Sequence, residues 1–381
     1  MSRRFRGGSR AHYAPTGHLV YGLGGALRAV GFDLNRLEVL GAPVPVLEQV
    51  GSVPNMSISG SGTLVYVPGG PPPAVFQRTL AWVDRQGRED PLNAPPRSYR
   101  YPRISPDGTR LAVDTTGSGT GDIWIWDFAR QALTRFTFDP AQDIYPVWTP
   151  DGRRLLFRSE RSGLANIFWQ AADGTGTVER LTESPNEQAP YSVSPDGTRL
   201  VFREDVRTTG QDLKVLTLQG ERRVEPLVQT AFNERNGEIS PDGRWLAYQT
   251  NESGQDEIYV RPFPDVNSGR WLVSAGGGRT PLWARSGREL FYQAPGGGAV
   301  FGVTVEGGGA NFRAGTPAKQ VEGQYFVGGG DTSPGRTYDV SPDGQRFLMV
   351  KVGEPDQTAA PPSIVVVQHW GEELKRLVPT N

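Results

Sequence analysis

Five side chains that could bind a cation or activate water lie at fixed distances before a four-residue motif that recurs along the chain. His12, Glu238 and Asp339 each stand two residues before a copy of the motif, and Asn55 and Asn236 each stand four residues before one. Carboxylate and amide oxygens suit a hard cation such as Ca²⁺, and an imidazole also accepts a transition metal. A bound metal would polarise a carbonyl or phosphoryl oxygen while Asp339 or His12 activates water. The pattern predicts either such a metal centre or hydrogen-bonded wall residues of a channel.

A second polar series consists of arginines five residues before the motif. Its members are Arg100, Arg235, Arg279 and Arg336. Guanidinium groups bind carboxylates and phosphates through paired N–H donors, so a ring of them predicts a site for an anionic ligand or an acidic protein segment. The alternative is ion pairing with neighbouring acids such as Glu234 at the surface.

The familiar catalytic motifs are absent from the sequence. It contains no Cys, no GxSxG nucleophile motif and no Gly-Lys pair that could belong to a phosphate-binding loop. The three histidines, His12, His18 and His369, do not have the spacing of a zinc site. A hydrolase or zinc enzyme with one of these motifs is therefore not expected.

The motif that sets these distances is a repeat. It occurs as SPDG, TPDG or a degenerate form at Ala14, Ser59, Ser105, Thr149, Ser194, Ser240, Ala284 and Ser341. The steps between copies are 45, 46, 44, 45, 46, 44 and 57 residues. A nearly constant step of about 40–50 residues is typical of the blades of a β-propeller.

The repeated motif has the residues of a tight turn between two strands. In the copy at Ser105, Pro106 presets φ, Asp107 can accept hydrogen bonds from its own backbone, and Gly108 tolerates a positive φ. Short apolar runs follow each copy, such as RLAV after Gly108 and WLAY after Gly243. We therefore expect the aspartates of these turns to be structural, not catalytic.

The predicted fold is an all-β, eight-bladed propeller of four-stranded antiparallel blades, with seven blades as the alternative because the first two copies are degenerate. We expect one closed propeller over residues 10–381, after a disordered basic start over residues 1–9. The innermost strand of each blade comes just before the turn and faces a central channel. A propeller can therefore gather the polar residues described above from separate blades.

Two segments resemble a known family. YPRISPDG (Tyr101–Gly108) and YPVWTPDG (Tyr145–Gly152) are similar to the YPxWSPDG signature of TolB-like, WD-type propeller repeats. More narrowly, Thr230–Pro264 and Tyr338–Val350 look like the propeller behind the catalytic domain of bacterial serine/threonine protein kinases. The kinase motifs HRD and DFG are missing from this chain. The resemblance implies a sensing or interaction module, which lies outside the membrane when it is fused to a receptor kinase.

Composition excludes several other classes of protein. The 381 residues carry a formal net charge of -1 and no long run of basic residues, so a charge-driven nucleic-acid partner is not expected. Neither a membrane-spanning stretch nor a secretory signal is found in the sequence. As written, the chain is expected in the cytoplasm, and outside it if the chain is a segment of a longer receptor kinase.

Two hypotheses about function follow. The first is a non-catalytic sensor or binding propeller that engages a protein segment or a small anionic ligand at the channel mouth, with no cofactor. The second is a metal-dependent hydrolase of lactones, esters or phosphotriesters, with Ca²⁺ or another divalent metal in the channel. Calcium-dependent lactonases and phosphotriesterases of other propeller families hold a metal at such a position. The sequence leaves open whether the protein is an enzyme.

Overall fold

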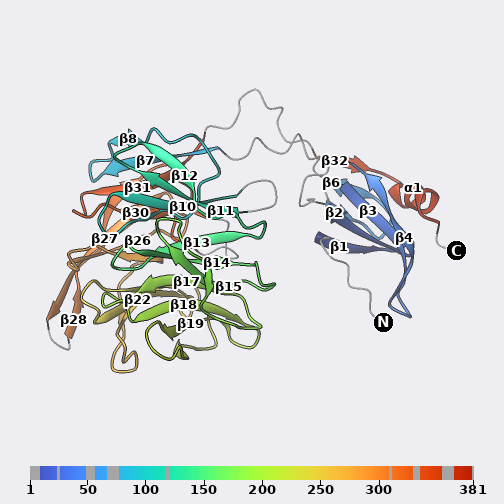
Figure 1. The fold of residues 1–381 in the computed structure, drawn as a ribbon. Helices are drawn as coiled ribbons and strands as arrows, with labels where there is room; N and C mark the ends of the chain where they lie inside the picture. The colour runs from blue at the N-terminus through green and yellow to red at the C-terminus, as the bar shows by residue number, and fades with distance from the viewer. Residues whose placement is uncertain are drawn as a thin grey trace. The chain divides into compact units, whose positions relative to one another are not determined.

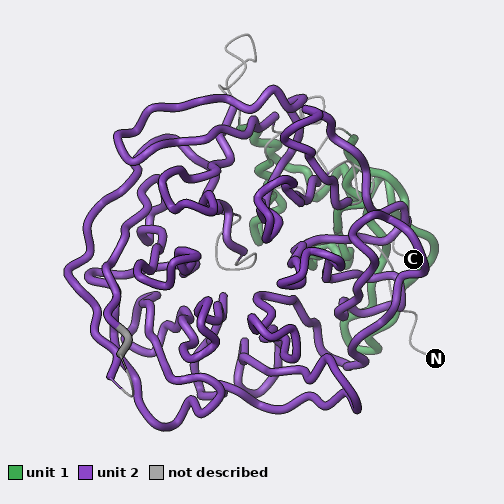
Figure 2. The backbone as a smooth tube through the Cα atoms, turned by 60° about the vertical axis from the view of Figure 1, so that its left-hand side comes forward, with its two compact units in different colours: residues 1–76, 354–381 green, residues 77–353 purple. Residues whose placement is uncertain are grey.

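The computed structural model describes residues 9–23, 26–48, 56–66, 77–116, 121–308, 311–328, 335–353 and 364–379. The chain divides into two compact units (Figure 2). Unit 1 comprises residues 1–76 and 354–381, and unit 2 comprises residues 77–353. Almost all of the regular structure is β-strand, as predicted.

Unit 2 is a propeller. Its described residues form six antiparallel sheets arranged around a central axis (Figures 1 and 2). Blade 1 contains β9 (Arg103–Ile104), β10 (Arg110–Thr116), β11 (Gly121–Asp127) and β12 (Ala132–Arg135). Blade 2 contains β13 (Asp143–Trp148), β14 (Arg154–Ser159), β15 (Asn166–Ala171) and β16 (Glu179–Arg180). Blade 3 contains β17 (Gln188–Val193), β18 (Arg199–Val206), β19 (Gly210–Thr217) and β20 (Val224–Val228).

The remaining blades complete the propeller. Blade 4 contains β21 (Glu234–Ile239), β22 (Trp245–Thr250), β23 (Glu257–Pro262) and β24 (Trp271–Leu272). Blade 5 has five strands, β25 (Arg279–Trp283), β26 (Glu289–Gln293), β27 (Ala299–Gly308), β28 (Asn311–Ala314) and β29 (Ala318–Glu322). Blade 6 contains β30 (Tyr338–Val340), β31 (Arg346–Val352), β7 (Arg78–Asp84) and β8 (Glu89–Pro91). The extra strand of blade 5 falls within the longest step of the repeat.

Blade 6 closes the propeller because its strands come from both ends of unit 2. Strand β31 pairs antiparallel with β7, from Arg346 opposite Asp84 to Val352 opposite Arg78. The pairing joins the last blade to the start of the unit and removes two sheet edges that would otherwise be exposed.

The hydrophobic core lies between neighbouring blades. At the boundary of blades 5 and 6, Phe291 and Phe347 are fully buried and meet edge to face, with ring centroids 5.0 Å apart. Strand β22 shows why the central strands are apolar, since each of its six residues is buried. Both faces of such a strand pack against protein, which explains the continuous apolar runs after each turn.

The repeated motif forms the turn between the first two strands of a blade, and its aspartate is structural, as predicted. In blade 1, Ser105 Oγ donates to Asp107 Oδ1 (2.5 Å), and the same oxygen accepts the backbone N–H of Thr109 (3.0 Å). These hydrogen bonds lower the pKa of Asp107 to about 2. The same contact between hydroxyl and carboxylate recurs in the turns that begin at Thr149, Ser194, Ser240 and Ser341.

The turns of adjacent blades also touch. A Cβ atom added to Gly108, which has φ 76°, would lie 2.8 Å from Cγ of Pro342 in the turn of blade 6. A Cβ added to Gly152 would meet Pro106 at 3.7 Å. The glycine of the motif therefore serves the turn and also lets neighbouring turns pack around the axis.

The described residues of unit 1 form two sheets and one helix. The first sheet contains β1 (Ser9–Ala14), β2 (His18–Leu23), β3 (Ala26–Asp33) and β4 (Glu38–Leu47). The second contains β32 (Val365–Val367), β6 (Leu64–Tyr66) and β5 (Met56–Ile58), and the helix is α1 (Trp370–Leu377). Val20, Leu27, Leu64, Trp370 and Leu374 form a common core. His18 is buried, with Nε2 2.6 Å from the carbonyl oxygen of Val378.

The propeller with four-stranded antiparallel blades is confirmed, but the count of eight blades is not. The first two copies of the repeat, at Ala14 and Ser59, lie in unit 1, and the structure has two compact units where the sequence predicted one propeller over residues 10–381. The physical reason is the pairing of β7 with β31, which closes unit 2 without residues 1–76. Of the start predicted to be disordered, residues 1–8 lie outside the described residues and Ser9 begins β1.

Candidate functional site

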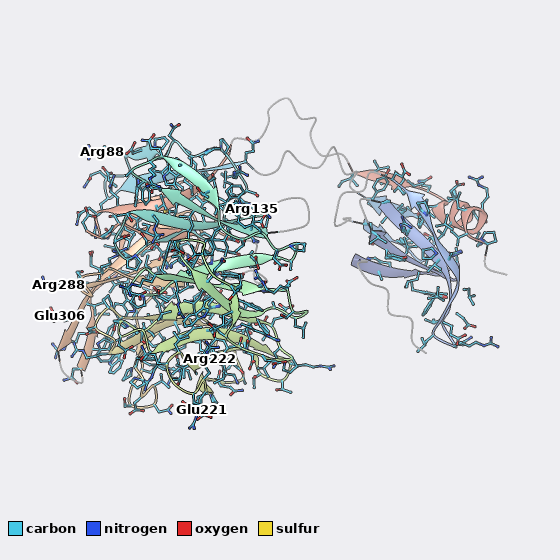
Figure 3. All side chains as sticks on the ribbon, viewed as in Figure 1. Arg88, Arg135, Glu221, Arg222, Arg288 and Glu306 are labelled. Atoms are coloured by element: carbon cyan, nitrogen blue, oxygen red, sulfur yellow. The ribbon has the colours of Figure 1, made fainter. Side chains whose placement is uncertain are left out.

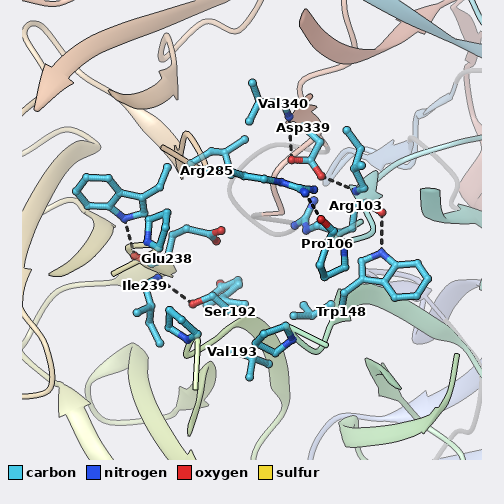
Figure 4. Close-up of a pocket in the computed structure, with 18 of the residues that line it drawn as sticks. Arg103, Pro106, Trp148, Ser192, Val193, Glu238, Ile239, Arg285, Asp339 and Val340 are labelled. Atoms are coloured by element: carbon cyan, nitrogen blue, oxygen red, sulfur yellow. Dashed lines mark hydrogen bonds between the residues drawn. The ribbon is translucent and has the colours of Figure 1, made fainter. Parts of the chain in front are cut away.

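A cavity of about 390 Å³ lies on the axis of unit 2, next to the repeated turns. We call it the mouth cavity. Every blade contributes the residue two positions before its motif, namely Arg103, Val147, Ser192, Glu238, Leu282 and Asp339. The turns add Pro106, Pro150, Pro195, Pro241 and Arg285 at the rim. Figure 4 shows these strand ends converging on one space.

A network of charged side chains occupies one side of the mouth cavity. Nη1 of Arg336 donates to Asp339 Oδ1 (2.8 Å), and its Nη2 lies 3.8 Å from Glu238 Oε1. The second carboxylate oxygen of Asp339 accepts the backbone N–H of Ile104 (2.6 Å). Asp339 thereby ties blade 6 to blade 1, while the carboxylate of Glu238 points into the cavity (Figure 4).

Burial shifts the pKa of Glu238 in this network and the pKa of the neighbouring Arg103. It raises the pKa of Glu238, against the opposing effect of the nearby Arg336 and Arg103. Burial, together with the positive charge of Arg336, lowers the pKa of Arg103 to about 10. Both shifts favour the neutral form of the group, as expected where water is partly excluded.

Arg285 crosses the rim of the mouth cavity. It occupies the position of proline in the repeated turn and extends from blade 5 to blade 1, past blade 6, as Figure 4 shows. Its Nη2 donates to the carbonyl oxygen of Ser105 (2.8 Å), and its Nη1 donates to the carbonyl oxygen of Pro106. Two backbone acceptors therefore hold the guanidinium in place.

The apolar residues one position before the motif serve both the core and the cavity wall. They are Ile104, Trp148, Val193, Ile239, Trp283 and Val340, and all of them line the mouth cavity. Two of them fix the backbone of a neighbouring blade: Trp148 Nε1 donates to the carbonyl oxygen of Arg103 (2.8 Å), and Trp283 Nε1 donates to that of Glu238 (3.0 Å). Hydrogen bonds between blades therefore hold two of these apolar wall residues in place.

The structure brings together two of the five predicted metal ligands. Glu238 and Asp339 line the mouth cavity, whereas His12 lies on β1 of unit 1 and is not among the lining residues. Asn55 lies outside the described residues. No group of three or more His, Cys, Asp or Glu side chains suited to a metal occurs in the described part of the chain.

Asn236 does not lie on the cavity wall, because a β-bulge interrupts its strand. The register of β21 against β22 shifts between Arg235 and Glu238, and Asn236 has a φ of 51°. Its side chain donates to Gln249 Oε1 (3.0 Å) and is buried. The simple alternation that places residues two apart on one face fails at such a bulge.

The predicted arginine series does not form one ring in the described structure. Arg100 pairs with Asp114 (2.8 Å), and Arg279 pairs with Asp256 (2.7 Å). Arg235 is buried, and only Arg336 lines the mouth cavity. Arg100, Arg279 and Arg336 are therefore ion-paired, as the alternative expected, but Arg100 and Arg336 pair with buried carboxylates instead of acids at the surface.

Sequence reasoning did not select two residues of the site, Arg103 and Arg285. Arg285 breaks the motif, since ARSG stands where other blades have a proline. A departure from a repeat at its most restricted position is the signal that could have identified it. Arg103 stands at the same offset as Glu238 and Asp339, so the same spacing marks it.

The fold and the cavity define a β-propeller with an axial pocket at its turns. The family described as the TolB beta propeller domain matches residues 87–286, more than half of the chain. The chain belongs to this family, which fits a binding role. The narrower likeness to propellers of protein kinases stays a prediction.

Individual relatives are similar over part of their length. The chain is 27% identical over 201 residues to "Uncharacterized peptidase YuxL" of Bacillus subtilis, covering 42% of this chain and 30% of that protein. It is 24% identical over 148 residues to "Tol-Pal system protein TolB" of Helicobacter pylori, covering 38% of this chain and 35% of that one. The match therefore spans about a third of the length of each of these two relatives.

A solved structure supports the fold. A TolB-like protein from Agrobacterium tumefaciens superposes with a TM-score of 0.56 at 17% identity, covering 73% of this chain and 98% of that one. Within the described residues, no helix has the length and apolar character needed to cross a membrane. The expected location of the chain stays a prediction.

Proposed function

We propose that this chain is a non-catalytic binding propeller that holds an extended protein segment in the mouth cavity. The observation that carries the proposal is the composition of this cavity. Each blade supplies an apolar residue such as Trp148 or Ile239 to its wall, four turns supply prolines to its rim, and charged groups lie on one side. An apolar pocket with a few fixed polar groups is the usual form of a ligand site.

The polar groups of the cavity are arranged for binding rather than for catalysis. Ser192 Oγ donates to the carbonyl oxygen of Gly237 (3.0 Å) and accepts the backbone N–H of Ile239 (3.1 Å). Ser240 Oγ donates to Asp242 (2.6 Å). Both hydroxyls hold the backbone in place. The partners of Ser192 are backbone groups, and the carboxylate that contacts Ser240 belongs to Asp242, a structural aspartate of the repeated turn whose lowered pKa makes it a weak base.

The carboxylates of the cavity also give little support to a metal-dependent hydrolase. Both oxygens of Asp339 already accept hydrogen bonds, from Arg336 and from the backbone N–H groups of Ile104 and Val340. A cation at this position would have to compete with the guanidinium of Arg336. Membership of the TolB propeller family, one of whose relatives carries the name of the Tol-Pal system, supports binding of a protein partner.

Selection of peptides on the full chain tests the proposal. A library of randomised peptides displayed on phage is selected on the wild-type protein, and recovered peptides are titrated against Val193→Trp and Val224→Trp. Val193 lines the mouth cavity, whereas Val224 is exposed on β20 of the same blade. We expect Val193→Trp to weaken binding at least tenfold by filling the cavity, and Val224→Trp to bind as the wild type does.

Two results would overturn the proposal. Recovered peptides that bind Val193→Trp as tightly as the wild type would place the binding surface elsewhere. A stoichiometric metal in the purified protein, together with chelator-sensitive turnover of a chromogenic ester or phosphotriester, would favour the hydrolase instead.

A further inference from the structure

We infer that the mouth cavity contains a carboxylate-binding site built on Arg285 and Arg103. The ligand of this propeller would then present a carboxylate attached to an apolar body. The inference rests on the proposed function and names the chemical group that the cavity recognises.

Arg285 is a fixed cation with unused donors. A guanidinium carries five N–H donors, and the carbonyl oxygens of Ser105 and Pro106 accept from Nη2 and Nη1. Among the described residues, no carboxylate forms an ion pair with this side chain. The positive charge of Arg285 at the rim is therefore not neutralised by a carboxylate of the described residues. Its remaining N–H groups can donate to a ligand.

Arg103 supplies a second, independent observation. It is 8% exposed and lines the mouth cavity, and its Nη1 donates to the carbonyl oxygens of Pro102 (2.7 Å) and Arg336 (2.9 Å). Its Nε is buried and has no hydrogen-bond partner among the described residues. Within the described residues Nη2 of Arg103 makes no hydrogen bond either, so this group remains to donate to an acceptor in the cavity.

The net charge of the side chains that line the cavity matches a ligand with a single negative charge. Its lining side chains include three arginines, Arg103, Arg285 and Arg336, and two carboxylates, Glu238 and Asp339, so the sum is one positive charge. One carboxylate neutralises this sum, whereas a doubly charged phosphate exceeds it. The two oxygens of a carboxylate also match the paired donors of a guanidinium.

The apolar wall accounts for the rest of the ligand. Trp148, Val193 and Ile239 face the same space as the arginines, so a carboxylate on an aromatic or aliphatic body would bury apolar surface there. The C-terminus of a protein segment and a small organic acid share this chemistry. The experiment below distinguishes these two sources.

Benzoate and its neutral analogue benzamide are the first probes. Each is titrated into the full-length protein while the indole N–H signals of Trp148 and Trp283 are followed by NMR, assigned with the Phe variants of each residue. We expect saturable shifts with benzoate and at least tenfold weaker binding of benzamide. Equal binding of the two probes, or no binding of benzoate, would overturn the inference.

Arg285→Pro tests the role of the rim arginine. Proline is the residue that other blades place at this turn position, for example Pro106 and Pro241, so the turn is expected to form. The matched control is Arg288→Ala, which removes an exposed arginine that follows the same turn (Figure 3). We expect Arg285→Pro to weaken benzoate binding on the order of tenfold to a hundredfold, and Arg288→Ala to leave it unchanged.

Circular dichroism of the variants shows whether each of them is folded. If Arg285→Pro does not fold, Arg285→Gln, which removes the charge but keeps an amide donor, decides the question by the same titration. Benzoate binding that is unchanged in the folded variant would overturn the inference.

Peptide probes distinguish a protein C-terminus from a small organic acid as the ligand. They also distinguish a failure of the carboxylate-binding site from a failure of the proposed function. The probes are acetyl-Pro-Leu-Phe with a free C-terminal carboxylate and the same peptide with a C-terminal amide. Tighter binding of the free acid than of benzoate indicates a protein C-terminus, and binding of benzoate alone indicates a small organic acid. If selected peptides bind at the mouth cavity whether or not they carry a carboxylate, the proposed function holds and the carboxylate site is wrong.

Discussion

The indole Nε1 of Trp283 in blade 5 donates a 3.0 Å hydrogen bond to the carbonyl oxygen of Glu238 in blade 4. Trp148 in blade 2 makes the same contact with Arg103 in blade 1, at 2.8 Å. In both pairs the tryptophan fixes the backbone of a residue whose side chain faces the mouth cavity. The contact links the packing between blades directly to the position of the charged groups.

Trp283→Phe removes this hydrogen bond and leaves the carbonyl oxygen of Glu238 without its indole donor. We expect the free energy of unfolding to fall by about 1–2 kcal/mol, measured by urea denaturation. Trp169→Phe is the control, because the indole of Trp169 donates to Glu179 at the exposed surface (2.6 Å). A loss as large in the control as in Trp283→Phe would contradict the argument.

Phe347→Ala opens a cavity at the boundary of blades 5 and 6, on a strand that closes the propeller. Phe347 is fully buried against Phe291, so we expect a loss of about 3–5 kcal/mol in the free energy of unfolding. Phe138→Ala makes the same chemical change at a side chain that is 73% exposed, where a change within about 0.5 kcal/mol is expected. Similar losses in the two variants would contradict the burial of Phe347 at this boundary.

The turn aspartates make stability fall in acid. Hydrogen bonds from Ser105 and Thr109 lower the pKa of Asp107 to about 2, below the unfolded value of about 3.9. Ionised Asp107 therefore stabilises the fold above pH 4, and this contribution is lost as the pH falls toward 2. We expect Asp107→Asn to lose about 1 kcal/mol at pH 7 and to converge with the wild type near pH 2 in denaturation curves. Asp90→Asn, at an exposed residue, should match the wild type throughout.

Glu234 makes the folded state less stable as the pH rises, which is the opposite of the effect of Asp107. Burial, with a smaller contribution from Asp212 and Glu252, raises its pKa to about 7, although Thr230 donates to it. The folded state therefore holds this proton more tightly than the unfolded state, and stability is lost as the pH rises from about 4.3 to 7. We expect Glu234→Gln to be more stable than the wild type at pH 8 by about 2 kcal/mol and equal to it at pH 4.

Urea denaturation between pH 4 and pH 8 measures this difference. Glu225→Gln, an exposed position on β20, is the control and should show no pH-dependent gain. A wild-type protein whose stability rises between pH 5 and pH 8 relative to Glu234→Gln would contradict the assignment.

Residues 77–353 should fold without the rest of the chain. All six blades and the pairing of β7 with β31 lie within this segment. We expect the isolated segment to show β-type circular dichroism and one cooperative unfolding transition on heating. Broad, non-cooperative unfolding would indicate that residues outside 77–353 complete the propeller.

Some features of this protein are local, and the sequence by itself determined them. The repeat predicts blades because a turn such as Ser105–Gly108 depends on the conformational preferences of four adjacent residues. The structural role of Asp107 followed from the same chemistry. Glu238 and Asp339 could be placed at the channel because each stands at the end of an inner strand, at a fixed distance from its turn.

Other features were decided only by the tertiary structure. The number of blades depends on where the propeller closes, and the pairing of β7 with β31 joins strands from opposite ends of unit 2. A β-bulge turned Asn236 away from the cavity, and its positive φ is set by the surrounding sheet rather than by the residue type. Arg285 reaches the carbonyl oxygens of Ser105 and Pro106 in a blade that is not its neighbour along the chain. Such contacts depend on how distant segments pack. The sequence can therefore mark Arg285 as a departure from the repeat, but it does not encode the partners that this side chain reaches.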